Sequence, residues 1–205
     1  MLTDTRIDMA GPVRAGQGLI LVHGRGGSAS DILQLGAALG LPEIALAAPE
    51  APGRSWWPTS FLAASAQMEP HVAQGLAAVD AAIARLAEAG VPADRIALGG
   101  FSQGACLALE YAARRGGVRA VFGLSGGLVG TADADGAASP ALYGHGDKRF
   151  DYDSDLTGVP VILEVHENDP HIPIARAKRS AEVFESLGAE TALHVMPGSG
   201  HGIGT

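Results

Sequence analysis

Hydrophobic and polar residues follow one another along the chain in blocks that predict short strands separated by longer helices. Residues 71–89 carry an apolar stripe at three- and four-residue steps, which predicts an amphipathic helix that ends at Gly90. Further helices are expected at 30–39, 105–115 and 173–187. Continuous apolar runs predict buried strands at 18–23, 44–49, 95–101, 118–124, 159–165 and 191–197.

This alternation predicts a mostly parallel sheet with helices on both faces, formed by one domain over residues 1–205. Residues 126–157, rich in glycine, alanine and aspartate, predict irregular surface. Active sites in such sheets lie beyond the carboxyl ends of the strands. Candidate residues are therefore sought just after each strand.

Composition narrows the class of protein. The chain is 47% hydrophobic and 18% charged, which excludes a disordered or fibrous protein. No apolar run is long enough to span a membrane, and the first residues show no signal peptide. A formal net charge of −8 argues against a nucleic-acid partner. The single cysteine, Cys106, forbids an internal disulfide and fits a cytoplasmic location.

Two segments match the nucleophile-elbow pattern G-x-S-x-G, and their context separates them. The elbow needs a strand before the serine and a helix directly after it. Ser102, in GFSQG, has both, whereas Ser125, in GLSGG, is followed by a segment that cannot start a helix. Gly100 and Gly104 would let the strand and the helix approach closely. Ser102 is therefore the expected nucleophile, and a plain helix N-cap is the alternative.

A serine nucleophile requires a base and an acid, and this elbow predicts the order serine, acid, histidine. His201 lies in a Gly-rich loop just after the last predicted strand, where the base should be. His194 lies inside that strand and is a weaker candidate. Asp169 follows the strand 159–165 and precedes a helix, so it is the expected acid. A turn or helix-capping carboxylate ahead of Pro170 is the alternative.

Three other carboxylates compete for the acid position. Glu164 is expected within the strand, and Glu167 lacks the proline-fixed turn that follows Asp169. Asp147 precedes the strand and falls in the irregular stretch. None of the three has the position that the elbow topology requires.

Acyl transfer also needs N–H donors for the oxyanion of the tetrahedral intermediate. One donor is expected from the backbone of Gln103, which follows the serine. The other is expected from Arg25 in the turn HGRGG after the first long strand, although that turn could also be purely structural.

A long connection between the strand 44–49 and the helix 71–89 contains the two tryptophans of the chain. Trp56, Trp57 and Phe61 would form an acyl pocket or a short lid beside the serine. The alternative is an aromatic plug that packs the loop onto the core.

Taken together, these segments resemble the phospholipase/carboxylesterase family of α/β-hydrolases, which includes enzymes similar to acyl-protein thioesterases. The matching strings are HGRGGS (23–28), SWWPTSF (55–61), GFSQGA (100–105), HENDPHIP (166–173), AEVFESLGAE (181–190) and MPGSGHGI (196–203).

The resemblance implies an α/β-hydrolase fold and a serine carboxylesterase, with acyl-protein thioesterase or lysophospholipase activity as alternatives. It implies the triad Ser102, Asp169 and His201, oxyanion amides from Arg25 and Gln103, a small-molecule ester substrate, no cofactor and no metal. Family members usually continue into a helix after the histidine, so we expect a further tail or a partner subunit, as in a homodimer, to cover the sheet there.

Three readings of other classes remain as alternatives. Gly24, Gly26 and Ala29 fit the dinucleotide pattern G-x-G-x-x-A, with Glu50 ending the next strand, but this leaves the serine elbow unexplained. The string HENDPH is one residue too long for the zinc motif H-E-x-x-H, and Pro170 would break the helix. A hydrolase-like binding module usually loses the nucleophile or the base, and this chain keeps both.

Overall fold

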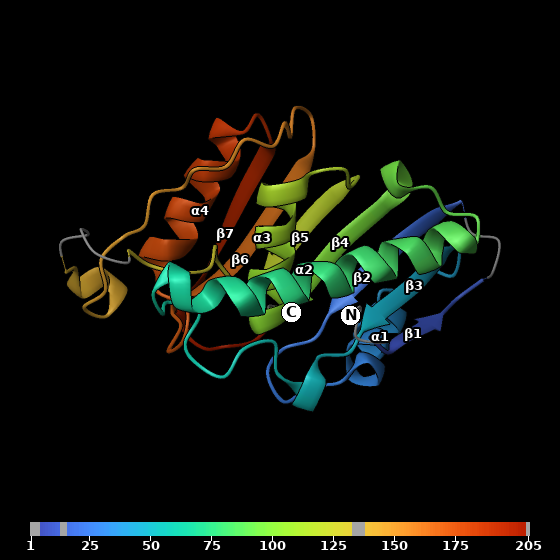
Figure 1. Ribbon diagram of the computed structural model, residues 1–205, viewed down its shortest axis with the longest axis horizontal. Coiled ribbons are helices and arrows are strands. Elements are labelled where there is room, and N and C mark those ends of the chain that lie inside the picture. Colours follow the sequence, from blue (N-terminus) through green and yellow to red (C-terminus); the bar gives the residue numbers. More distant parts are fainter. Residues whose placement is uncertain (1–4, 13–15, 133–137, 204–205) are drawn as a thin grey trace.

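The described strands form one sheet in the order β1-β3-β2-β4-β5-β6-β7, in which only the edge strand β1 is antiparallel (Figure 1). The computed structural model describes residues 5–12, 16–132 and 138–203. The strands are β1 (Ile7–Ala10), β2 (Gln17–Val22), β3 (Ile44–Pro49), β4 (Ile96–Phe101), β5 (Ala120–Leu124), β6 (Pro160–Asn168) and β7 (Glu190–Ser199).

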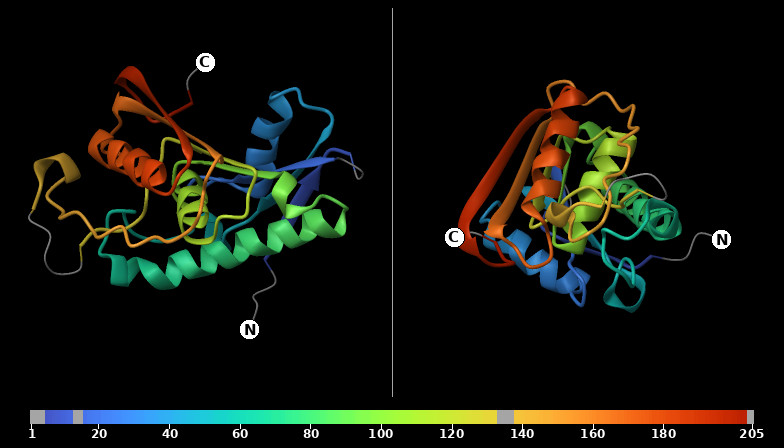
Figure 2. Two further views of the ribbon diagram at one scale, coloured as in Figure 1. Left: turned by 90° about the horizontal axis from the view of Figure 1, so that it is seen from above. Right: turned by 90° about the vertical axis from the view of Figure 1, so that its left-hand side faces the viewer.

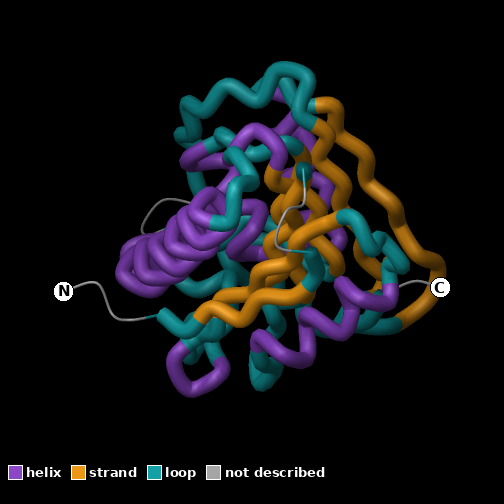
Figure 3. The backbone as a smooth tube through the Cα atoms, turned by 90° about the vertical axis from the view of Figure 1, so that its right-hand side faces the viewer, coloured by secondary structure: helices purple, strands orange, loops and turns teal. Residues whose placement is uncertain are grey.

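Helices cover both faces of this sheet, which confirms the predicted fold class (Figures 1 and 2). The helices α2 (Ser65–Glu88), α3 (Gln103–Arg115) and α4 (Ile174–Ser186) lie on one face, and α1 (Ala29–Ala38) lies on the other. Figure 3 shows the strands between these two helical layers. The 3₁₀ turns are η1 (Pro52–Arg54), η2 (Ala93–Arg95) and η3 (Pro140–Leu142).

Two hydrophobic clusters hold these layers together, because successive side chains of a strand point to opposite faces. On β2, Ile20 and Val22 belong to the large cluster with α2 and α3, whereas Leu19 and Leu21 pack with Ile32 of α1. A strand buried on both faces reads as a continuous apolar run, which is why β2 was predictable. No helix in the described ranges is long and apolar enough to cross a membrane.

The structure differs from the predicted elements at β1 and at the start of α2. β1 was not predicted, because four residues without alternation carry no strand signal. α2 begins at Ser65 and continues through Pro70, whereas the helix was predicted to start after the proline. The Ser65 backbone N–H and Oγ both donate to the carbonyl of Thr131, at 3.1 and 2.8 Å, so a tertiary contact fixes this first turn.

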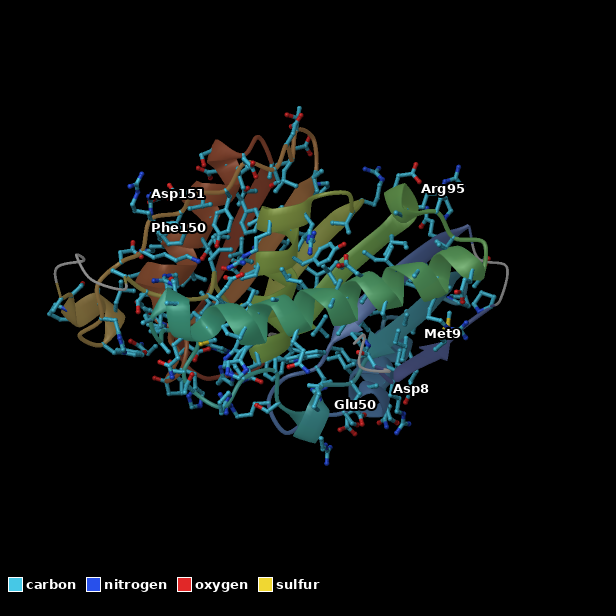
Figure 4. All side chains as sticks on the ribbon, viewed as in Figure 1. Asp8, Met9, Glu50, Arg95, Phe150 and Asp151 are labelled. Carbon is cyan, nitrogen blue, oxygen red and sulfur yellow. The ribbon has the colours of Figure 1, made fainter. Side chains whose placement is uncertain are left out.

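The segment predicted as irregular surface contributes to the core instead. Residues 133–137 of that segment lie outside the described part of the chain. Leu128, Val129 and Leu156 are buried, and the side chains of Lys148 and Tyr152 reach the buried carboxylate of Glu110 at 3.2 and 2.6 Å. The segment is therefore irregular in backbone but is held by buried polar contacts. Figure 4 shows its exposed part near Phe150 and Asp151, beside α4.

Candidate active site

Ser102 lies in a sharp turn between β4 and α3. Its backbone has φ 55° and ψ −119°, a conformation that residues with a Cβ rarely adopt. The turn is possible because its neighbours are small: a Cβ on Gly100 would lie 2.3 Å from the carbonyl carbon of Gly104, and a Cβ on Gly104 would lie 2.0 Å from the oxygen of Val22. This strand–turn–helix context is the one expected for a nucleophile elbow.

The structure brings Ser102, His201 and Asp169 together, as the sequence predicted. The Ser102 Oγ lies 2.8 Å from Nε2 of His201, and Nδ1 of His201 lies 3.0 and 2.9 Å from the two carboxylate oxygens of Asp169. An ionised carboxylate only accepts hydrogen bonds. Nδ1 therefore donates to Asp169, and Nε2 is left as the acceptor for the serine proton.

The loop after β6 fixes the carboxylate of Asp169. Its Oδ1 accepts hydrogen bonds from the backbone N–H groups of His171 and Ile172, at 2.8 and 3.0 Å, and its side chain is fully buried. The hydroxyl of Tyr143 donates to the Asp169 carbonyl at 3.0 Å. The carboxylate thus has one orientation, directed at the imidazole of His201.

Ser125, the rival serine, supports the loop that carries His201. It is buried, and its Oγ donates to the carbonyl of Gly202 at 3.0 Å. Its backbone N–H donates to the Glu164 carbonyl at 2.7 Å, which extends the pairing of β5 and β6. The hydroxyl of Ser125 is therefore engaged in supporting the loop of His201, and Ser125 does not line the cavity beside Ser102.

The carboxylates that competed with Asp169 lie elsewhere. Asp147 accepts from the buried guanidinium of Arg176 at 3.0 Å. Glu164 lies within β6, as predicted, and Glu167 is exposed near the end of that strand. Among the alternative bases, His194 lies exposed on β7.

The turn after β2 lies beside the elbow. An ideal Cβ on Gly24 would lie 3.3 Å from the Cβ of Ser102, and Arg25 and Gln103 both line the cavity next to the serine. Among the described residues, the backbone N–H groups of Arg25 and Gln103 have no hydrogen-bond partner. Both groups are therefore free of hydrogen bonds within the described part of the chain, and the oxyanion role predicted for them stays a prediction.

His23 gives this turn its shape, a role that the sequence did not reveal. Its Nδ1 lies 2.7 Å from the carbonyl of Gly24, and its Nε2 accepts from the backbone N–H of Ala51 at 3.0 Å. These two partners require a neutral ring that carries its proton on Nδ1. Burial lowers the pKa of His23, which favours that neutral form.

A cavity of about 490 Å³ lies next to Ser102 and His201. Its lining includes Trp57, Phe61 and Ile172, so the loop with the tryptophans forms part of its wall. The indole of Trp56 is not part of the lining, and its Nε1 donates to the His23 carbonyl at 2.9 Å. Both indoles are also packed into the core, so the loop combines the two roles that the sequence left open.

Cys106 also borders the cavity, one helical turn after the serine. Its thiol is buried, and burial raises the pKa of Cys106 to about 12. A thiol with such a pKa is not ionised near neutral pH and is a poor nucleophile. Ser102 therefore has no competitor from this side chain.

The helix N-terminus that a dinucleotide would need is already occupied. The carboxylate of Glu50 accepts from the backbone N–H of Ala29 at 3.0 Å, and Ser28 caps the same helix by accepting from Asp31 at 3.2 Å. Ser28 is the N-cap residue, so α1 begins at Ala29, one residue before the predicted start. Figure 4 shows Glu50 near Asp8 and Met9, away from the labelled Arg95.

Within the described ranges, no cluster of three metal-ligating side chains is present.

Comparison with known proteins decides the family. A family model described as phospholipase/carboxylesterase matches residues 9–205. The chain belongs to the phospholipase/carboxylesterase family. The family supports an ester hydrolase, and it agrees with the resemblance seen in the sequence.

Relatives of this phospholipase/carboxylesterase family member agree on the fold. A phospholipase/carboxylesterase from Dyadobacter fermentans is 34% identical, with a TM-score of 0.84 over 98% of this chain and 91% of that one. Esterase PE8 is 25% identical, with a TM-score of 0.74 over 98% of this chain and 93% of that one. Acyl-protein thioesterase 1 of Gibberella zeae is 31% identical over 118 residues, which are 56% of this chain and 44% of that protein. The chain thus spans less than half the length of this thioesterase relative.

Proposed function

We propose that this protein is a serine carboxylesterase that hydrolyses carboxylic esters, including thioesters, through an acyl-enzyme on Ser102. The observation that carries the proposal is the 2.8 Å contact between the Ser102 Oγ and Nε2 of His201, whose Nδ1 is hydrogen-bonded to the carboxylate of Asp169. A serine hydroxyl becomes an effective nucleophile only when a positioned base can take its proton.

In the proposed mechanism, the Ser102 Oγ attacks the ester carbonyl while Nε2 of His201 accepts its proton. The oxyanion of the tetrahedral intermediate is bound by the backbone N–H groups of Arg25 and Gln103. The imidazolium of His201, stabilised by Asp169, then protonates the leaving alcohol or thiol. A water molecule, deprotonated by the same imidazole, releases the acid and restores Ser102.

Thioesters belong in the proposal because one relative is an acyl-protein thioesterase. Thioesters and oxygen esters share the acyl half that would occupy the cavity, and only the leaving group differs. A panel of p-nitrophenyl esters, acyl thioesters and lysophospholipids tests the function directly. Labelling of Ser102 by a fluorophosphonate, located by mass spectrometry, tests the nucleophile; an unlabelled serine and an inert panel would refute the proposal.

We expect kcat/KM to rise with pH and to reach an alkaline plateau, because His201 must be neutral to accept the serine proton. The measurement is the pH profile for one p-nitrophenyl ester, with the melting temperature followed at each pH. If the protein stays folded at every pH, the lower kcat/KM at acidic pH cannot result from unfolding and is assigned to protonation of the base. A profile that stays flat from mildly acidic to mildly alkaline pH would contradict this role.

We expect Trp57→Ala to raise KM for medium-chain esters several-fold and to change acetate ester hydrolysis little. Each buried methylene of an acyl chain contributes about 0.8 kcal/mol, so a lost indole wall affects longer chains most. The measurement is KM against chain length at equal folded fraction, because loss of a buried tryptophan side chain destabilises the fold by roughly 3–5 kcal/mol.

Phe150→Ala is the matched control for this prediction, since Phe150 is an aromatic side chain that does not line the cavity. Its effect on turnover should be equal for all chain lengths. If Trp57→Ala also left the chain-length profile unchanged and only lowered the melting temperature, the indole would serve packing alone.

A further inference from the structure

The two residues proposed to bind the oxyanion through their amides also hold the cavity wall through their side chains. We define residues 55–59, which contain both tryptophans, as the tryptophan loop. Gln103 and Arg25 reach this loop from two different elements, the start of α3 and the turn after β2. The loop is thereby connected to the oxyanion site from both sides.

Gln103 makes the buried half of this connection. Its Nε2 donates to the carbonyl of Trp57 at 2.8 Å, and its Oε1 accepts from the backbone N–H of Trp56 at 3.0 Å. The hydroxyl of Ser55 lies 2.8 Å from the same Trp57 carbonyl and 3.3 Å from Oε1. A side-chain amide with one donor and one acceptor thus satisfies two successive backbone groups of the loop, as a neighbouring strand would.

Arg25 makes the solvent-exposed contacts between the oxyanion site and the tryptophan loop. Its guanidinium donates to the carbonyls of Pro58, at 3.2 Å, and Thr59. The planar guanidinium presents several donors in a fixed arrangement, so one side chain can hold two successive carbonyls. Because water can replace these exposed bonds, their loss should have a smaller effect than the loss of the buried Gln103 bonds.

We propose that the side chains of Gln103 and Arg25 are positioning groups that fix the tryptophan loop and thereby set the acyl-chain selectivity of the enzyme. This inference rests on the proposed esterase function. The oxyanion would be bound by the backbones of these residues, and the acyl chain would be selected by the loop that their side chains hold. A displaced loop therefore alters the contacts of a long acyl chain more than those of an acetyl group.

The first test is Gln103→Met, which keeps the approximate volume and the backbone N–H but removes both loop contacts. We expect its kcat/KM for an octanoyl ester to fall at least tenfold more than for the acetyl ester, mainly through KM. Arg25→Met should shift the same ratio about threefold in the same direction. Both esters form the same oxyanion. Any effect of a variant on oxyanion binding, through the lost Arg25 charge or a shifted backbone N–H, is therefore equal for the two esters and cancels in this ratio.

The matched controls are Gln74→Met and Arg95→Met, at exposed positions outside the cavity, and neither should change the ratio. Figure 4 shows Arg95 near the far end of α2, away from α4. If Gln103→Met does not fold, Arg25→Met carries the test alone. An equal loss for both esters in the folded variants, or no loss, would overturn the proposal.

A second readout does not depend on activity. Both tryptophans of the chain lie in the loop and are 5% and 1% exposed, so fluorescence excited selectively from tryptophan, and not from the three tyrosines, reports on this segment. We expect Gln103→Met to at least double the acrylamide quenching constant and Gln74→Met to leave it unchanged. Unchanged quenching in Gln103→Met would refute the positioning role. If the native protein hydrolysed no ester, the esterase function would fail, while quenching would still decide whether the loop is held in this way.

Discussion

Ser102→Ala should lower ester turnover at least a thousandfold while the protein stays folded. The serine supplies the covalent path, and loss of such a nucleophile leaves only the smaller contributions of the oxyanion donors and substrate binding. The hydroxyl bonds to His201, so its loss removes one contact and leaves the packing of α3 unchanged. Initial rates with a p-nitrophenyl ester, at matched far-UV circular dichroism, measure the effect.

Ser125→Ala is the control, because it removes a hydroxyl from the second segment with the elbow pattern. That hydroxyl holds the Gly202 carbonyl next to the base, so we expect a loss of less than about tenfold through a less ordered His201. If Ser125→Ala were the inactive variant and Ser102→Ala the active one, the assignment of the nucleophile would be wrong.

Asp169→Asn should lower kcat roughly 10³–10⁴-fold near neutral pH without a large change in KM. The two backbone N–H groups that now bind Oδ1 would hold the amide oxygen of the asparagine, which directs its NH₂ group toward His201. Nδ1 would then have to accept, and the ring proton would move to Nε2. A protonated Nε2 cannot take the proton of Ser102.

Glu167→Gln provides the matched carboxylate-to-amide change, because Glu167 is exposed and lies two residues before Asp169. It should retain nearly full activity. The two variants are compared by steady-state kinetics with one ester and by thermal unfolding. An Asp169→Asn enzyme with native kcat would show that the acid is another residue.

The order of Ser102, Asp169 and His201 was predictable because each follows a strand that the apolar pattern marks clearly. Parallel strands bring their carboxyl ends to one edge, so residues far apart in sequence meet there without any contact having to be inferred. The Gly-rich turn containing Arg25 follows from the same rule. This is why the position of the proposed site could be predicted from local patterns and topology.

The support around these residues was not predictable, since it depends on contacts between irregular segments. His23 bonds to Ala51, and the Gln103 side chain bonds to Trp56 and Trp57, across loops whose paths no periodicity determines. The contacts of Lys148 and Tyr152 with Glu110 were not predictable for the same reason, because both residues lie in the segment 126–157, whose composition is typical of an exposed loop. Side-chain pairing of this kind becomes visible only when the tertiary path is known.

The backbone conformation of Ser102 has a consequence for the history of the gene. Positive φ at a residue with a Cβ is strained by about 1–3 kcal/mol, whereas glycine adopts it freely. This strain is present whether or not a substrate is bound. Stability alone would therefore favour glycine at position 102, and the proposed catalytic role would offset the cost of keeping serine there. A duplicated copy released from the proposed catalytic role should therefore tolerate glycine at position 102, with a gain in stability rather than a loss.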